Sequence, residues 1–313
     1  MTGGGGFSSW PTNIDPKQAE EYYKDSKSKT ERIAFEQKVS KLLDNYLEQF
    51  NKRDVNKTQD RLNEIKDALK RDIEGFIDLR YGGSIQKHTY VDGLSDIDTL
   101  AIVNKSELLN ADPDEVKKYF LKTIKKNIKG LTSVSDGKLA VTLRFKDGME
   151  IQLLPAIKTQ QGIKIPDASG ESWSNIVNPN KFADKLSKLN AKVGYKVVPT
   201  IKLIKAINSQ LPEKNQMTGY HIESLAIKTF SSCKAGETTK DLIGKFFQEA
   251  KDAIKTPISD KSGQSIHVDD YLGKRNSETR RRLSYQLDLI ARKIKSANDS
   301  CSIKTWENIF GDV

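Results

Sequence analysis

Apolar residues recur every three or four positions in two stretches near the start of the chain. Residues 28–50 follow the i, i+3/i+4, i+7 pattern of an amphipathic helix, and a shorter repeat occupies residues 62–73. A helix with this pattern buries one apolar face against a core. We therefore predict a layer of N-terminal helices that covers a sheet. A glycine run precedes them and is too flexible to pack, so we expect residues 1–15 to form a flexible N-terminus.

The pattern then changes to short apolar runs that are typical of strands. Residues 76–81 and 99–103 are such runs, and apolar residues alternate on both sides of Asp147-Gly148, a two-residue hairpin turn. Between them, Asp112-Pro-Asp-Glu115 combines a cap residue, a first-turn proline and acids at the positive end of a helix dipole. The sequence thus predicts a mixed sheet with an antiparallel hairpin and one well-capped helix.

Strand signals stop near residue 180. Periodic apolar segments then predict a helical second half, at residues 180–193, 199–211, 219–233, 239–254 and 276–297. This order favours an α+β fold in two lobes, a core lobe over residues 16–185 and a helical lobe over residues 186–313. A cleft between two lobes is a common place for a ligand.

Composition narrows the functional classes. The 313 residues carry a net charge of +10, which favours partners that bear phosphate, such as nucleotides or nucleic acid. No apolar run approaches the ~20 residues that a membrane span needs, and the N-terminus lacks a signal-peptide layout, so we expect a cytoplasmic protein without a membrane partner. Cys233 and Cys301 stand in no paired motif, which excludes a disulfide framework or a cysteine zinc site, and we expect two buried thiols.

Two short groups of residues carry candidate chemistry. Gly82 and Gly83 leave backbone amides open beside the Ser84 hydroxyl, so a turn here offers N–H and O–H donors to phosphate oxygens. Asp96 and Asp98 precede and begin an apolar strand, so both carboxylates face one side, about 6.6–6.8 Å apart along the backbone. Carboxylates so placed can bind one or two hard cations. Either group alone is usually an ordinary turn or a solvated loop.

Together, at this spacing, the two groups resemble the signature of the DNA polymerase β-like nucleotidyltransferase superfamily. Further matches point to the bacterial cyclic-oligonucleotide synthases (CD-NTases), relatives of cyclic GMP-AMP synthase and 2′-5′ oligoadenylate synthase. These matches are Thr89, Ser95, Ile151-Gln-Leu-Leu-Pro-Ala156, Asn178-Pro179, Phe182, the helix at 199–208, Tyr220-His-Ile-Glu-Ser-Leu225, Trp306 and Ile309-Phe-Gly311.

The resemblance implies a polymerase β-like mixed sheet with N-terminal helices and a C-terminal helical lobe. It implies Mg²⁺ (or Mn²⁺) held by Asp96 and Asp98, with the donor triphosphate at Gly83 and Ser84. The implied substrates are nucleoside triphosphates, and the implied product is a cyclic or linear di- or trinucleotide second messenger in anti-phage defence, which a downstream effector recognises.

Two further positions are candidates for nucleotide binding. Residues 185–212 hold six lysines and no acids, and Lys202 and Lys205 share one helical face that suits a triphosphate. Lys205 stands where the family's phosphate-contacting lysine looks to be, although a solvated basic face is the alternative. Tyr220, at a helix start, has a flat ring that can stack on a base. Its alternative role is that of a core aromatic.

The sequence departs from the family pattern at Gln152, where relatives carry the third metal-binding acid. An amide binds a divalent cation more weakly than a carboxylate and cannot take a proton from an attacking hydroxyl. Three interpretations stay open: an introduced replacement of an acid by Gln that traps substrate, compensation by Glu150 on the same strand face, or a naturally impaired enzyme that binds nucleotide without turnover. Gln152 nonetheless occupies a catalytic position, with Asp96 and Asp98.

The leading hypothesis is therefore a Mg²⁺-dependent nucleotidyltransferase that joins nucleoside triphosphates. The alternatives are a template-independent nucleotidyltransferase acting on RNA or protein, and a non-catalytic nucleotide-binding regulator. The clusters Arg280-Arg-Arg282 and Arg292-Lys293 offer a regulatory nucleic-acid surface, or else an ordinary solvated helix face.

Overall fold

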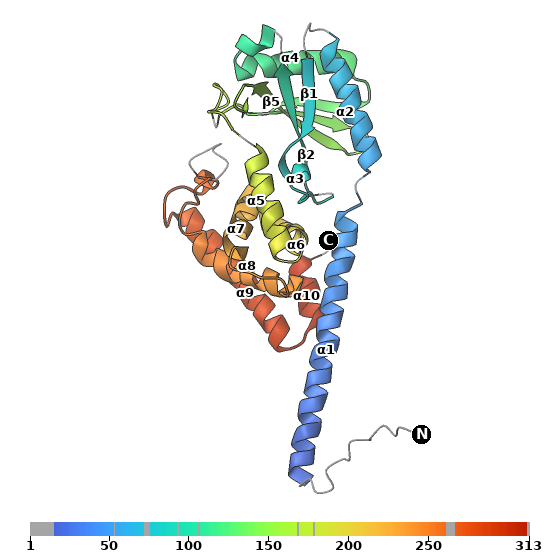
Figure 1. Cartoon of the computed structure of the whole chain (residues 1–313), viewed down its shortest axis with the longest axis vertical. Helices are drawn as coiled ribbons and strands as arrows, with labels where there is room; N and C mark the ends of the chain where they lie inside the picture. Colours follow the sequence, from blue (N-terminus) through green and yellow to red (C-terminus); the bar gives the residue numbers. More distant parts are fainter. Residues whose placement is uncertain are drawn as a thin grey trace, which may run out of the picture.

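The computed structural model describes residues 16–52, 54–71, 76–92, 94–104, 107–167, 169–177, 179–260 and 267–311. The predicted flexible N-terminus at 1–15 and the motif residue Asn178 lie outside these residues. Figure 1 shows a part built around a sheet above a part built of helices, with one long helix running along the side of the helical part.

The sheet has six strands among the described residues, in the order β1-β2-β5-β4-β3, with β6 beside β5. Their bounds are β1 Phe76–Tyr81, β2 Ile97–Asn104, β3 Leu131–Asp136, β4 Val141–Phe145, β5 Glu150–Lys158 and β6 Ile163–Lys164. The central pair, β2 and β5, is parallel, and the other pairs are antiparallel. The predicted mixed sheet and its hairpin are confirmed, and the turn at Gly148 has a φ of 85°. The sequence analysis missed β3, in which only two of six residues are large and apolar.

One face of this sheet is covered by α2 (Val55–Lys70) and α4 (Pro113–Asn127), as Figure 1 shows. Their apolar faces share a core with the inward residues of the strands, such as Val141, Leu143, Ile151 and Leu153. The predicted start of α4 is confirmed, because Asp112 accepts from the Glu115 backbone N–H at 2.8 Å and Glu115 accepts from the Asp112 N–H at 3.1 Å. This capping box satisfies two N–H groups that have no partner within the helix.

The second half of the chain is helical, as predicted, which confirms the α+β class. Its helices are α5 Pro179–Lys192, α6 Val197–Ser209, α7 Gly219–Phe230, α8 Thr239–Ala253, α9 Glu278–Asp299 and α10 Ile303–Phe310. Short 3₁₀ helices lie at Glu107–Asn110, Glu213–Asn215 and Asp270–Leu272, and a one-turn helix α3 covers Gly83–Gln86.

The first helix, α1 (Pro16–Phe50), packs in a different place from the one predicted. Its buried residues Phe35, Val39 and Leu43 belong to the core of α5–α10, not to the sheet. Tyr46 stacks on Phe310 of α10 with ring centroids 4.4 Å apart. Helical periodicity reveals that a face is buried but not which core buries it, and this is why the prediction failed. The lobe boundary at 185/186 stays a prediction, and α1 lies with the helical part.

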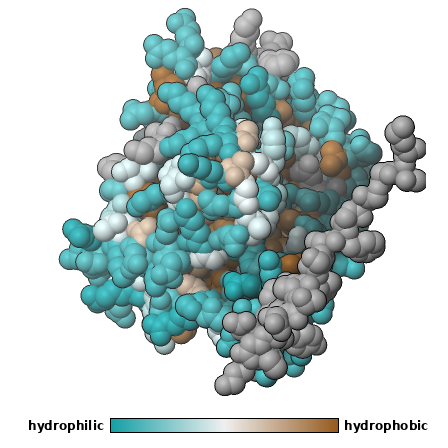
Figure 2. Space-filling view, turned by 60° about the horizontal axis from the view of Figure 1, so that its bottom comes forward, coloured by the Kyte–Doolittle hydropathy of each residue, from teal (hydrophilic) through white to brown (hydrophobic). Residues whose placement is uncertain are grey.

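The two cysteines differ in burial. Cys233 is buried as predicted, whereas Cys301 is exposed in the turn between α9 and α10. Among the described helices, none has the combination of length and apolar character that crossing a membrane requires. The face seen in Figure 2 is mostly hydrophilic, with hydrophobic residues in small separate areas.

Candidate active site

The strands β2 and β5 place the polar residues of the candidate site on one face of the sheet. Along β2, Ile97 and Thr99 are buried while Asp98 between them is half-buried, and Gln152 alternates in the same way between Ile151 and Leu153. Asp98 and Gln152 are direct partners in the parallel register. Because side chains alternate along a strand, these two residues face away from the core that α2 and α4 cover.

The loop between β1 and α3 wraps around Asp98. The Gly82 N–H donates to the Asp98 carbonyl at 2.9 Å, and the Ser84 backbone N–H donates to the Asp98 carboxylate. Gly83 has a φ of 45°, and a Cβ on it would lie 1.7 Å from Asp98 Oδ2. Only glycine lets the loop approach the carboxylate this closely. The Ser84 hydroxyl oxygen is buried without a hydrogen-bond partner among the described residues. This hydroxyl can therefore donate a hydrogen bond to a ligand or accept one from it.

The two aspartates have perturbed acidities. Burial, together with the nearby carboxylates of Glu150 and Asp98, raises the pKa of Asp96, although Arg144 lowers it in part. Burial also raises the pKa of Asp98, against the opposing effects of Lys87 and the Ser84 N–H. Carboxylates that are crowded and desolvated in this way gain from a positive charge between them.

The residue at the third acid position has a definite partner. The Gln152 amide nitrogen donates to Asp96 Oδ2 at 2.7 Å. Glu150, the predicted substitute, instead accepts from Arg144 Nε at 2.6 Å. No group of three His, Cys, Asp or Glu side chains converges anywhere in the described part of the chain. The site thus offers two carboxylates and an amide, an all-oxygen set that suits Mg²⁺ or Mn²⁺ but carries one negative charge less than three acids.

A buried ionic cluster lies beside the aspartates and joins the sheet part to the helical part. Glu223 of α7, only 1% exposed, contacts Lys205 of α6 at 3.0 Å and also contacts Lys87 and the hydroxyl of Thr89. Lys205 Nζ also donates to the Thr89 carbonyl at 3.0 Å. Lys87 and Thr89 follow α3, so one carboxylate from the helical part holds a segment of the sheet part.

The pKa values of Glu223 and Lys205 reflect the numbers of positive and negative groups around them. Burial raises the pKa of Glu223, but Lys205 and Lys87 outweigh burial, and the pKa lies below its usual value. Burial lowers the pKa of Lys205, and Glu223 offsets this only in part. The two shifts are compatible because Glu223 faces two ammonium groups, whereas Lys205 shares its single carboxylate with Lys87. Asp98 also interacts with both lysines, so the two ammonium groups offset the carboxylates of Glu223 and Asp98 and are the cationic groups that an incoming phosphate can contact.

A cavity of about 290 Å³ brings most of the predicted residues together. Those in its lining are Gly83, Ser84, Asp96, Asp98, Lys205 and Tyr220. The Tyr220 ring packs against Phe182 with centroids 4.9 Å apart, and its hydroxyl donates to Asp260 at 2.6 Å. Segments more than 100 residues apart in the chain thus meet at one cavity.

Two predicted residues lie outside this lining, and two charged residues that were not predicted lie in it. Lys202 donates to Asn51 at the end of α1 and faces a different cavity, and Gln152 reaches the site only through Asp96. Lys87 and Glu223 line the cavity although neither was predicted to. Lys87 lies three residues after Ser84, and a cation so close to a phosphate-binding turn was the available signal. Nothing local marks Glu223, because its partners are distant in sequence.

The family model described as the Second Messenger Oligonucleotide or Dinucleotide Synthetase domain, SMODS, matches residues 34–190. The chain belongs to the SMODS family. No curated protein matches it. The residues matched by the SMODS model include the loop of Gly83 and both aspartates, which confirms the resemblance to the bacterial cyclic-oligonucleotide synthases and places the chain among nucleotidyltransferases.

Solved structures share the SMODS chain's fold over most of its length. A complex of CdnC with HORMA-deltaN from E. coli MS115-1 is 14% identical, covers 88% of this chain and 96% of that one, and has a TM-score of 0.64. CdnG from Bradyrhizobium diazoefficiens, in complex with GTP, is 12% identical, with coverages of 82% and 89% and a TM-score of 0.63. The cyclic AMP-GMP synthase DncV from Vibrio cholerae is 11% identical, with coverages of 83% and 72% and a TM-score of 0.59. The predicted polymerase β-like fold is thereby confirmed.

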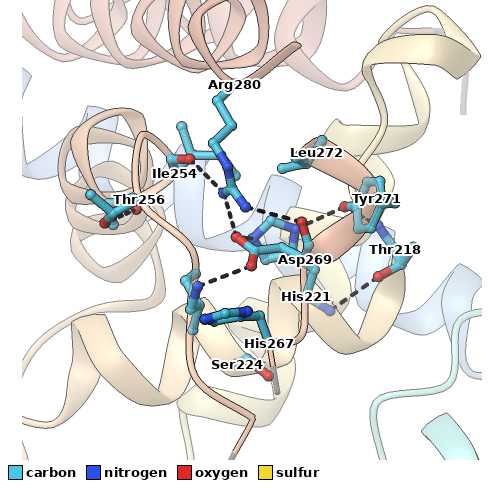
Figure 3. A network of polar contacts seen from close by, with 12 residues as sticks. Thr218, His221, Ser224, Ile254, Thr256, His267, Asp269, Tyr271, Leu272 and Arg280 are labelled. Atoms are coloured by element: carbon cyan, nitrogen blue, oxygen red, sulfur yellow. Dashed lines mark hydrogen bonds and ion pairs between the residues drawn. The ribbon is translucent and has the colours of Figure 1, made fainter. Parts of the chain in front are cut away.

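A second polar network fixes the segment that contacts Tyr220 (Figure 3). We call residues 254–260 and 267–273, which connect α8 to α9, the strap. Arg280 of α9 is fully buried and donates to Asp269 Oδ2 at 2.6 Å, to the Ile254 carbonyl at 3.0 Å and to the Gly273 carbonyl at 2.9 Å. Asp269 in turn accepts from the Ile258 N–H at 2.9 Å. Arg280 thus ties both ends of the strap to α9.

The same network reaches the start of α7. Tyr271 lies with its hydroxyl 2.8 Å from His221 Nδ1, and that oxygen accepts from the Thr218 N–H at 3.3 Å. Burial lowers the pKa of His221 to about 4, with Asp269 opposing and Arg280 adding to the shift. The ring is therefore neutral at pH 7 and acts as a hydrogen-bonding spacer. Tyr220 lies next to it in sequence, so the strap and α7 together determine where that ring lies.

This arrangement corrects one expectation. Arg280 is buried in an ion pair and cannot belong to a nucleic-acid surface. Arg282 donates to Asn215 at 3.0 Å, and Arg292 pairs with Asp288 at 2.8 Å. The other four basic residues of the two clusters are exposed, so a regulatory nucleic-acid surface and an ordinary solvated helix face both stay predictions for them.

The close approach at Gly83 gives a first prediction. In Gly83→Ala the new Cβ must displace the Asp98 carboxylate, so we expect at least 10-fold weaker binding of a non-hydrolysable ATP analogue, measured by calorimetry. Gly130→Ala is the matched control, because Gly130 also has a positive φ, 87°, but no neighbour within 4 Å of a Cβ. It should lose about 1–2 kcal/mol of stability and no affinity. Equal affinity losses in the two variants would contradict this explanation.

The ionic cluster gives a second prediction. Glu223→Gln leaves two buried ammonium groups without their shared carboxylate, so we expect the free energy of unfolding to fall by about 3–5 kcal/mol in urea denaturation. Glu249→Gln, at an exposed position of α8, should change it by less than about 0.5 kcal/mol. If Glu223→Gln were as stable as this control, the cluster would not hold the two parts together.

The strap gives a third prediction. Arg280→Met should cost about 3–5 kcal/mol of unfolding free energy, because it leaves the Asp269 charge buried and unpaired. Combining it with Asp269→Asn should cost clearly less than the two single changes added together, with a coupling of about 1–3 kcal/mol. Arg281→Met, exposed and adjacent, is the control. Strict additivity would mean that the Arg280–Asp269 pair is not what anchors the strap.

Proposed function

We propose that this SMODS chain is a template-independent nucleotidyltransferase of the cyclic-oligonucleotide synthase type, which joins nucleoside triphosphates into a di- or trinucleotide second messenger. The observation that supports this most is the cavity in which the unpartnered Ser84 hydroxyl, Asp96, Asp98 and Lys205 meet. Phosphoryl transfer needs hydrogen-bond donors to the phosphate oxygens, carboxylates that can hold a metal ion, and positive charge near the phosphates, and this cavity contains all three.

In the proposed step, a ribose 2′- or 3′-hydroxyl oxygen of one nucleotide attacks the α-phosphorus of another. A new phosphodiester P–O bond forms, the bond between the α-phosphorus and the oxygen that bridges to the β-phosphate breaks, pyrophosphate leaves, and the proton of the attacking hydroxyl passes to solvent, or to a carboxylate where position 152 carries one. Gly83 and Ser84 hold the triphosphate through N–H and O–H donors, and Lys205 and Lys87 supply positive charge to it. The Tyr220 ring stacks on a base. Asp96 and Asp98 would hold Mg²⁺ or Mn²⁺, which neutralises charge on the phosphates.

Gln152 limits this reaction in a specific way. Its amide cannot accept the proton of the attacking hydroxyl, and its nitrogen lies on Asp96 in place of a third carboxylate. The ion pair of Glu150 with Arg144 argues against compensation by that carboxylate. These contacts favour a second candidate function for the chain as it stands, namely nucleotide binding with little or no turnover. A role in anti-phage defence, with an effector that recognises the product, belongs to the first candidate.

The decisive comparison restores an acid at position 152. Labelled ATP, GTP, CTP and UTP are incubated with Mg²⁺ or Mn²⁺, treated with phosphatase and resolved by chromatography. We expect Gln152→Glu or Gln152→Asp to form about 10²–10⁴-fold more oligonucleotide than the chain as it stands, because a base and a third negative ligand return. Gln161→Glu adds the same charge at an exposed position and should have no effect.

Each other result has a definite meaning. Loss of the restored activity on adding Asp98→Asn is required by the proposal, and persistence would overturn it. Tight nucleotide binding without product in every variant would establish the regulator instead. Extension of a labelled RNA primer would redirect the function to RNA ends.

A further inference from the structure

A cavity with mainly apolar walls lies outside the site discussed so far. It occupies about 510 Å³ between α5 and α7, and residues 257–259 of the strap close one side. Its lining is Phe182, Lys185, Leu189, Ser224, Ile227, Lys228, Ser231, Pro257, Ile258 and Ser259. We call it the α5–α7 cavity. A volume of several hundred Å³ within a concave surface suits a small molecule, whereas protein partners usually meet flatter surfaces.

The α5–α7 cavity has an apolar floor and a basic rim. Phe182, Leu189 and Ile227 form an apolar floor, each less than one tenth exposed. Lys185 and Lys228 stand exposed at the rim, and neither forms an ion pair with another residue that the structure describes. None of the lining residues is acidic. An apolar floor with uncompensated ammonium groups at the rim complements an anion that carries an apolar body.

The α5–α7 cavity shares a wall with the nucleotide cavity. Phe182 lines the first, Tyr220 lines the second, and their ring centroids lie 4.9 Å apart. The Lys87 ammonium lies 5.1 Å from the centroid of each ring. A ligand that displaces Phe182 therefore also displaces Tyr220 and Lys87, which line the nucleotide cavity. The strap, which closes one side of the α5–α7 cavity, also contacts Tyr220 through Asp260.

We propose that the α5–α7 cavity is a second ligand site, which takes a small organic anion with a flat aromatic or aliphatic body and is coupled to nucleotide binding through Phe182 and Tyr220. Lys185 and Lys228 bind the anionic group, and the apolar floor binds the body. The coupling rests on the proposed nucleotide site, but occupancy of the α5–α7 cavity does not.

The first test uses 8-anilinonaphthalene-1-sulfonate, an anion of this class whose fluorescence rises in apolar surroundings. We expect Lys185→Gln/Lys228→Gln to weaken its binding at least 10-fold. Lys188→Gln/Lys234→Gln removes the same charge from exposed lysines that do not line the cavity, and it should leave affinity within 2-fold. The uncharged 1-anilinonaphthalene should bind equally to all three proteins. Equal effects of the two lysine pairs would overturn the proposal, because binding would then reflect net charge alone.

The second test blocks the cavity without changing charge. Ser231→Trp places a large ring at an exposed lining position and should reduce probe binding at least 10-fold. Ser232→Trp, the exposed neighbour that does not line the cavity, should not. Retained binding in Ser231→Trp would place the probe elsewhere and overturn the proposal.

The third test separates the two cavities. Saturating ATP with Mg²⁺ should change the affinity for the probe by a constant factor of at least 2, and the probe should change the affinity for ATP by the same factor, because coupling is reciprocal. Complete displacement that grows with ATP concentration would show the probe in the nucleotide cavity and overturn the proposal. Probe binding with no ATP binding at all would contradict the nucleotide site and the coupling, and would leave the second site intact.

Discussion

The arrangement of the whole site depends on one buried carboxylate. Glu223 comes from the helical part, and it binds Lys87 and Thr89 of the sheet part as well as Lys205 of its own part. A charge that is 1% exposed is tolerable only because several donors reach it at once. Glu223 therefore links the two parts of the chain beside the cavity, where the loop of Gly83 and Ser84, the aspartates and Tyr220 meet.

Local pattern predicted most of the fold. The hairpin around Asp147-Gly148, the capped start of α4 and the helices from α5 onward follow from short-range periodicity and turn chemistry. Long-range packing did not follow: α1 has an apolar face that fits either core, and β3 has too few apolar residues to be recognised. A pattern of period 3.6 or 2 reports that a face is buried, and it carries no information about the partner.

The candidate site also combines residues that local sequence predicts with residues that only distant contacts reveal. The glycine-serine turn and the two aspartates lie within 16 residues, so backbone geometry alone brings them together. Lys87 and Glu223 acquire their importance only from partners on other elements. The arginines of α9 show the opposite error: a run of cations in a sequence suggests a solvated surface, but Arg280 is fully buried.

In the proposed site, the position of the Tyr220 ring is set by contacts that lie outside the cavity of the aspartates. Tyr220 lines the cavity of the aspartates, and its ring packs against Phe182, which lines the α5–α7 cavity. The hydroxyl donates to Asp260 of the strap, and the strap is joined to α9 by the pair of its Asp269 with Arg280 of α9. A ligand that displaced Phe182 would therefore change the position of the Tyr220 ring, whereas Asp96 and Asp98 lie at the start of β2 in the centre of the sheet. The residues proposed for the chemistry and those proposed for its control thus lie on different elements, a central strand and the packed aromatic pair between two cavities.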